Sequence, residues 1–275
     1  MAALIKEGCA MERPARPPVR HSLAVRLTHW LNVVILLVLL ASGLQIFNAH
    51  PALYWGETST FDDPWISMAA QRRGEHLAGV TRIGELTLTT TGVLGASDGQ
   101  VRGFPAWATL PSYRSLADGR RWHFFFAWLF LFNGLIYLAW GAASGHFRRA
   151  LAPRRSELVP RHLGREILDH ARLRFPHGRY NTLQKLAYLA VIFVLLPLML
   201  LTGLAMSPGV NAAMPWIFEM FGGRQSARTF HFLSATALVA FVLIHLAMVV
   251  ASGSVRQIRA MVTGRDPPPR AIAAA

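Results

Sequence analysis

The sequence predicts an all-α integral membrane protein, a bundle of four transmembrane helices with a long periplasmic loop between the first and second helices. Apolar residues occupy 53% of the 275 positions, charged residues only 15%, and the mean hydropathy is positive. Four apolar stretches are long enough to cross a bilayer, and none has Asp, Glu, Lys or Arg at its centre. The expected spans are residues 23–47, 122–145, 183–206 and 230–252.

Charge is unevenly divided between the two sides of this predicted bundle. Nearly all of the net charge of +14 lies on one side of the bundle, in the N-terminal segment, the loop between the second and third spans and the segment after the fourth span, each counted with the basic residues at the adjoining span ends. The positive-inside rule places this side in the cytoplasm. We therefore expect an N-in, C-in protein of the bacterial inner membrane, with residues 21–260 as its membrane domain between the tails 1–20 and 261–275.

The segments between and within the spans carry further signals. The first span follows a Pro/Arg-rich tail without a convincing cleavage site, so we expect an uncleaved helix. The periplasmic loop, residues 48–119, is far longer than a connection needs, and its Thr/Gly run at 86–95 suggests short extended structure. It is interpreted as a docking platform for a periplasmic partner; an insertion that packs on the helix ends is the alternative. Pro197 predicts a kink in the third span.

Four histidines lie inside the apolar spans: His29, His123, His231 and His245. His231 and His245 are fourteen positions apart, which places them on one helix face about 21 Å apart along the axis. His123 and His231 each begin a helix that descends from the periplasm, so they can meet near that surface. His29 begins a rising helix and His245 comes down to a similar level. The sequence thus predicts two sites of two imidazoles, one above the other.

Two imidazoles from different helices are what six-coordinate haem b requires, and an ionisable group inside a membrane is a functional hypothesis by default. For each histidine alone, a hydrogen bond to a neighbouring helix is the alternative. Zinc would need further ligands, and a proton relay would usually recruit carboxylates within the spans. Cys9 is the single cysteine, which excludes an intrachain disulfide, a C-x-x-C-H haem attachment and a cysteine-ligated iron–sulfur cluster.

Arginines stand one helical turn before three of these histidines, at Arg26, Arg120 and Arg228. A guanidinium fork matches a haem propionate, but arginines also flank membrane spans in general, and both interpretations stay open. With both axial positions of the iron filled by protein, electron transfer is the remaining use of such a haem.

This histidine pattern resembles the bacterial cytochrome b561 superfamily, which includes the b-type cytochrome subunits of nickel–iron hydrogenases and formate dehydrogenases. Four segments are similar to thiosulfate-reductase-type cytochrome b subunits within it: residues 133–137, 145–149, 180–185 and 201–208. The resemblance implies a di-haem subunit that exchanges electrons between the quinone pool and a periplasmic molybdopterin oxidoreductase of sulfite-oxidase type. It assigns His123 and His231 to the periplasmic haem, and His29 and His245 to the cytoplasmic haem.

Two other functions stay open at this point. A free-standing quinol oxidase would reduce a small oxidant such as superoxide at its outer haem, although such an enzyme gains little from a long loop over that face. A haem-free transporter or scaffold would lack the b-type α band. Tyr180, Gln184 and Lys185 are candidates for a quinone pocket near the inner haem.

Overall fold

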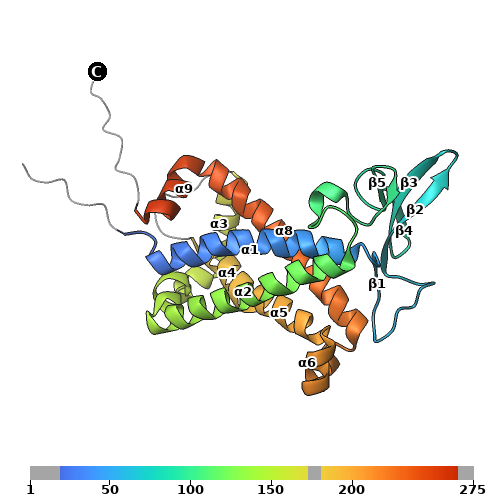
Figure 1. Ribbon diagram of the computed structural model, residues 1–275. Coiled ribbons are helices and arrows are strands. Elements are labelled where there is room, and N and C mark those ends of the chain that lie inside the picture. Colours follow the sequence, from blue (N-terminus) through green and yellow to red (C-terminus); the bar gives the residue numbers. More distant parts are fainter. Residues whose placement is uncertain (1–18, 173–180, 266–275) are drawn as a thin grey trace, which may run out of the picture.

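Four long helices run through the molecule (Figure 1). The computed structural model describes residues 19–172 and 181–265. Within these residues, four helices are long and apolar enough to cross a membrane: Leu23–Phe47, Leu116–Ala143, Thr182–Ala205 and Arg224–Ala251. The chain is therefore a multi-pass membrane protein, as its hydropathy predicts.

Two of the helices begin earlier than predicted. α2 (Leu116–Ala143) starts six residues before position 122, because the Ser115 hydroxyl caps it by accepting the backbone N–H of Asp118. α8 (Arg224–Ala251) starts six residues before position 230. Both first turns are polar, so an apolar window does not detect them. α1 (Leu23–Phe47) agrees with its predicted span and is capped by the Ser22 hydroxyl.

The third span is irregular where the sequence predicts a kink. It consists of α4 (Thr182–Ala190), a π-helical turn at Val191–Leu195 and α5 (Leu196–Ala205). Pro197 has no backbone N–H, and its ring crowds the carbonyl four residues earlier. The wider π-helical turn lies directly before it and accommodates this lost hydrogen bond.

Residues 48–115 contain β-sheet among turns and irregular segments, so the prediction of an all-α chain is wrong for this loop. A four-stranded antiparallel sheet has the order β1-β2-β3-β4. The strands of the loop are β1 (Ala52–Leu53), β2 (Ile66–Arg73), β3 (His76–Ile83) and β4 (Leu86–Thr89), and a small hairpin adds β5 (Ala96–Ser97) and β6 (Gln100–Val101). β4 accounts for the start of the extended run expected at 86–95.

The sheet as a whole is not predicted from the sequence because its strand β3 is covered on both faces. A Cβ on Gly79 in β3 would lie 2.2 Å from the carbonyl oxygen of Leu94, which crosses the sheet there. β3 therefore shows four consecutive buried positions instead of the alternation that marks a half-buried strand. The hairpin turns at Gly74 and Gly84 use positive φ angles of 62° and 53°.

This sheet insertion (residues 48–115, with the turn Ala106–Ala108) covers one end of the bundle, here called the outer end. Phe47 of α1 and Phe232 of α8 pack against its apolar core. Its core residues are Leu53, Ile66 and Met68, with Trp65, Leu94 and Phe104 packed beside them. The Asn48 side chain exchanges two hydrogen bonds with the backbone of Phe104, at 2.6 and 3.1 Å.

The insertion also caps the last span. The Gly56 carbonyl accepts the backbone N–H groups of Gln225 at 3.0 Å and Ser226 at 3.1 Å in the first turn of α8. A helix N-terminus has N–H groups without intrahelical partners, and this loop supplies the acceptor. The short helices α6 (Pro208–Ala213) and α7 (Pro215–Met220) connect α5 to α8 at the same end.

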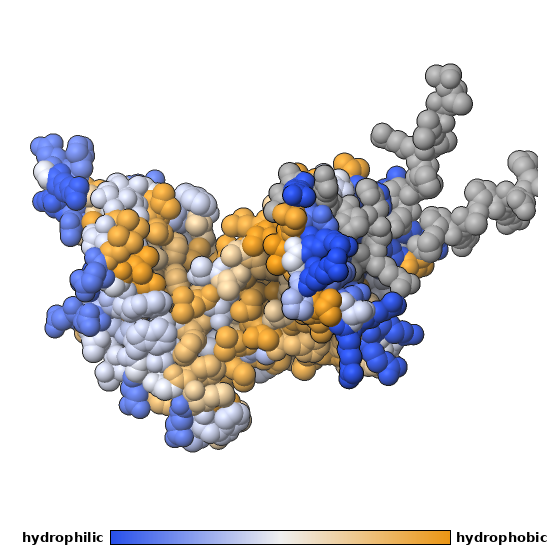
Figure 2. All heavy atoms as spheres, turned by 180° about the vertical axis from the view of Figure 1, so that it is seen from behind, coloured by the Kyte–Doolittle hydropathy of each residue, from blue (hydrophilic) through white to orange (hydrophobic). Residues whose placement is uncertain are grey.

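The opposite end of the bundle, the inner end, carries α3 (Pro160–Ala171) and α9 (Ser254–Thr263) (Figure 1). A π-helical turn at Phe147–Leu151 and a 3-10 turn at Arg155–Leu158 lead from α2 to α3. Lys185 pairs with Glu157 at 2.8 Å, and this contact holds the pKa of the Glu157 carboxyl below its ordinary value. Figure 2 shows apolar side chains over the middle of the molecule and strongly hydrophilic ones towards its two ends.

Candidate functional site

Two of the four span histidines meet at the outer end. His123 of α2 and His231 of α8 have ring centroids 6.3 Å apart and ring planes inclined by 64°. This is the pairing predicted from their depth. We refer to His123 and His231 as the outer pair.

The Nδ1 atoms of the outer pair are both held by hydroxyl groups. Nδ1 of His123 lies 3.1 Å from Ser42 Oγ and 3.1 Å from the Leu39 carbonyl oxygen. Nδ1 of His231 lies 2.9 Å from Thr202 Oγ1. Each hydroxyl has one proton and can donate it one turn back along its own helix, Ser42 to Val38 at 2.6 Å and Thr202 to Leu198 at 2.7 Å.

This arrangement assigns the tautomer of the outer pair. A hydroxyl whose proton is already donated can only accept from an imidazole, so each Nδ1 carries the N–H. Each Nε2 then keeps its lone pair, which is the state of an imidazole that binds a metal. The Ser42 and Thr202 hydroxyls, which belong to different spans, thus leave the Nε2 lone pair of each histidine available to a metal.

Glycines next to these hydroxyls let the rings approach the neighbouring helices. A Cβ on Gly43 would lie 3.4 Å from Cε1 of His123, and a Cβ on Gly203 would lie 3.6 Å from Cε1 of His231. The hydroxyl–glycine pair therefore occurs twice, as Ser42-Gly43 in the first span and Thr202-Gly203 in the third. The repeat of the two-residue pattern near the outer end of both spans was the available signal.

The other two span histidines meet further along the bundle. His29 of α1 and His245 of α8, the inner pair, have ring centroids 6.4 Å apart and planes inclined by 57°. Phe241 stacks on His245 at 6.0 Å and 18°. Nδ1 of His29 is buried and has no hydrogen-bond partner within the described residues. Hence, within the described residues, His29 lacks a hydroxyl support of the kind that holds each histidine of the outer pair.

An amide anchors the helices next to the inner pair. Asn133 of α2 is buried and donates to the Thr28 carbonyl at 3.0 Å and to Asn32 Oδ1 at 2.7 Å. Thr28 and Asn32 flank His29 on α1. The hydrogen bonds of Asn133 therefore fix the position of α1 against α2 at the level of the inner pair.

The spacing in both pairs fits one metal ion between two imidazoles. A metal–imidazole bond is about 2 Å long and the ring centre lies about 1 Å beyond the nitrogen, so trans imidazoles have centroids about 6 Å apart. The observed 6.3 and 6.4 Å agree with this value. No cluster of three or more His, Cys, Asp or Glu occurs in the described ranges 19–172 and 181–265. The donor sets thus suit an iron whose remaining ligands come from a porphyrin.

The three predicted arginines have different surroundings. Arg26 donates to the Val262 carbonyl of α9, and Arg228 donates to the His50 carbonyl while lying 5.2 Å above the Phe47 ring. Arg120 is exposed and lies 5.3 Å above the Phe124 ring. Two of the three guanidinium groups thus tie a membrane helix to a neighbouring segment, and their contact with a propionate stays a prediction.

An open groove lies on the insertion beside Arg228. It has a volume of about 580 Å³, and its lining includes His50, Tyr54, Phe61 and Arg82. His50 Nε2 lies 3.0 Å from the Tyr54 hydroxyl. Burial and the nearby Arg228 charge lower the pKa of His50, which keeps the ring neutral at neutral pH.

The candidates for a quinone pocket have structural partners where they are described. Lys185 is paired with Glu157, and Gln184 forms a capping box with Asn181 at the start of α4. Tyr180 lies outside the described residues.

Membrane helices that bring histidines together in two facing pairs are the arrangement expected of a membrane-embedded b-type cytochrome, a class of electron-transfer proteins. The chain belongs to the prokaryotic cytochrome b561 family, whose model matches residues 20–264. This confirms the predicted superfamily. The chain is similar to the putative protein-methionine-sulfoxide reductase subunit YedZ1 of Azospira oryzae, with 29% identity over 228 residues, 82% of this chain and 87% of the relative. No solved structure matches the chain.

Proposed function

We propose that the chain is the membrane-anchor subunit of a respiratory oxidoreductase, in which two haem b groups carry electrons between the quinone pool and a periplasmic partner. The observation that carries the proposal is the presence of two imidazole pairs, each with the spacing of ligands that share one ion, 6.3 and 6.4 Å between centroids. His231 and His245 are about 21 Å apart along α8, a large part of the roughly 30 Å hydrocarbon core.

In this proposal His123 and His231 hold the outer haem, and His29 and His245 hold the inner haem. Held by these histidines, a haem would supply one-electron transfer and would leave no site open for a substrate on the iron. The residues of the chain keep the ligands in place. Ser42 and Thr202 fix the Nδ1–H tautomers of the outer pair, and Asn133 fixes α1 against α2 beside His29.

In this proposal the sheet insertion is the surface to which a periplasmic partner binds. It covers the end of the bundle that contains the outer pair, and the Phe61 side chain beside its groove is 73% exposed. The proposed partner is a periplasmic molybdopterin oxidoreductase of sulfite-oxidase type. The name of the relative from Azospira oryzae, a reductase subunit, favours electron flow from quinol to the partner. The orientation is N-in and C-in in the bacterial inner membrane, since the arginine-rich residues 147–171 lie at the other end.

The test is a reduced-minus-oxidised spectrum of the purified full-length chain, with iron per chain. We expect a b-type α band, about two haems per chain, reduction by quinol, and co-purification of a molybdenum protein from the native membrane. Quinol-driven superoxide consumption by the isolated chain would favour the free-standing quinol oxidase instead. Absence of the α band would contradict both functions.

The hydroxyl groups predict a redox effect at the outer haem. Thr202→Val keeps the shape of the side chain but removes the hydroxyl acceptor for Nδ1–H of His231. A less electron-rich imidazole stabilises ferric iron less, so the outer potential should rise, by about 20–60 mV for a hydrogen bond worth about 0.5–1.5 kcal/mol. Potentiometric titration of both haems measures it. Thr236→Val is the matched control, because Thr236 is on the exposed face of α8. A shift of the inner potential alone would contradict the assignment of the pairs.

A further inference from the structure

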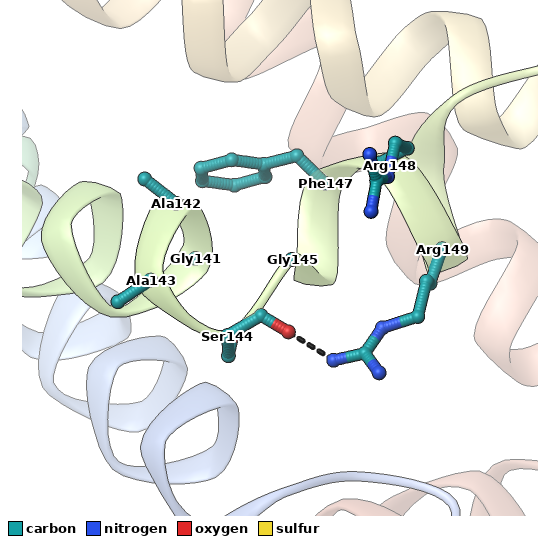
Figure 3. Close-up of a pocket in the computed structure, with 8 residues that line it drawn as sticks. All are labelled: Gly141, Ala142, Ala143, Ser144, Gly145, Phe147, Arg148 and Arg149. Atoms are coloured by element: carbon teal, nitrogen blue, oxygen red, sulfur yellow. Dashed lines mark hydrogen bonds between the residues drawn. The ribbon is translucent and has the colours of Figure 1, made fainter.

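A second site lies at the inner end of α2. The chain reverses there at Gly145, whose φ is 65°, and the π-helical turn Phe147–Leu151 folds back over the end of the helix. The Phe147 ring covers Gly141 so closely that a Cβ on Gly141 would lie 2.3 Å from Cζ of Phe147. The fold thereby leaves a hollow of about 550 Å³ (Figure 3), and its lining consists of Gly141, Ala142, Ala143, Ser144, Gly145, Phe147, Arg148 and Arg149.

The hollow combines apolar and cationic walls. Gly141, Ala142, Ala143 and Phe147 contribute hydrocarbon, whereas Arg148 and Arg149 contribute the charge. Arg149 donates to the Ser144 carbonyl, the contact drawn in Figure 3, which orients its guanidinium across the Gly145 turn. A guanidinium carries five N–H donors, so most of those on the two arginines stay available to a ligand. No carboxylate lines the hollow, and its charge is positive.

A third group in the hollow needs a partner. The Ser144 Oγ atom is buried and has no hydrogen-bond partner among the residues that the structure describes. A buried hydroxyl without a partner costs free energy, and a ligand with several acceptor oxygens would satisfy it together with both arginines. A phosphate group has this property, and bidentate arginine contacts suit it.

We infer that this hollow binds the phosphate of an anionic glycerophospholipid. The site lies at the end of a membrane-spanning helix, where the apolar surface gives way to the basic segments before α3. This is the depth of the headgroups, and the apolar wall lies on the side from which acyl chains would come. Basic pockets at the ends of membrane helices bind anionic headgroups in preference to neutral ones. The inference does not depend on the identity of the redox partner or on the number of haems.

The test measures lipid binding to the delipidated full-length chain in detergent by native mass spectrometry. Phosphatidylglycerol should bind about tenfold or more tightly than phosphatidylcholine. The double variant Arg148→Gln/Arg149→Gln should lose this preference, and Ser144→Ala should weaken phosphatidylglycerol binding without lowering the melting temperature. The matched control is Arg161→Gln/Arg165→Gln, which removes two exposed charges from α3 at the same end of the molecule. It should retain the preference.

Two outcomes would overturn the inference. Equal loss of phosphatidylglycerol in the pocket and control variants would show that overall charge, not this hollow, holds the lipid. Binding of inorganic phosphate with no binding of phosphatidylglycerol would assign the hollow to a free anion. Melting curves of all variants, compared with the wild type, establish that each is folded.

Discussion

Replacement of His123 by Ala is expected to remove the outer haem and leave the inner haem in place. The two pairs share α8 but take their other ligand from different helices, α2 for the outer pair and α1 for the inner pair. Loss of one axial imidazole therefore affects one site only. Iron per chain should fall by about half, and the remaining spectrum should be that of the inner haem. His29→Ala should give the reciprocal result.

The control for this experiment is His76→Ala, since His76 is an exposed residue in the sheet insertion. It should keep the full haem content. If His123→Ala and His29→Ala lost the same spectral component, the assignment of the pairs would be wrong. If neither variant lost haem while both stayed folded, the four histidines would not be the ligands.

The second large effect is expected at the contact between the insertion and α8. Gly223 has a φ of 110°, and a Cβ there would lie 2.7 Å from the carbonyl carbon of Gly56. Gly223→Ala should therefore separate the Gly56 loop from the first turn of α8, in addition to a backbone strain of about 1–3 kcal/mol. We expect a lower melting temperature and faster proteolysis within residues 48–115.

Gly222 is the matched control for this substitution. Its φ of 69° is also positive, but its Cβ would meet only Ser226 Oγ at 4.0 Å. Gly222→Ala thus carries the backbone strain without the collision. Gly223, with φ 110° and ψ 171°, lies in a region that is essentially restricted to glycine, so the difference between the two melting temperatures measures the contact with Gly56 together with this larger strain. Equal destabilisation by both variants would mean that this contact contributes little.

The helices and the histidine pairs could be predicted because each depends on a one-dimensional property. A span needs only a length of apolar residues, and fourteen positions on a helix place His231 and His245 on one face whatever surrounds them. The depth of each histidine in the membrane then indicates which histidine of a neighbouring helix it can face. For this reason the sequence could indicate which histidine rings lie close together, whereas their role as haem ligands stays a prediction.

The fold of the insertion and the contacts of the arginines depend on segments that are far apart in the chain. Spacing along the sequence therefore does not predict them. The strands are hidden because β3 is covered on both faces. The positions of Arg26 and Arg228 three residues before a histidine indicate a helix face, but their acceptors are carbonyls of Val262 and His50, which are far along the chain. Likewise, Ser42 resembles any small residue of an apolar helix in the sequence, and only the structure shows its contact with His123.

Because His231 and His245 belong to one uninterrupted helix, the separation of the outer and inner pairs along the bundle is a property of a single rigid element. Sliding or tilting of α2 would disturb the geometry at the outer position alone, and movement of α1 would act first on the inner one. A displacement of the Gly56 loop would act on α8 and move His231 and His245 together, so that the distance between these two histidines stays unchanged. The geometry within each histidine pair can therefore change locally, while the distance between the two pairs stays constant.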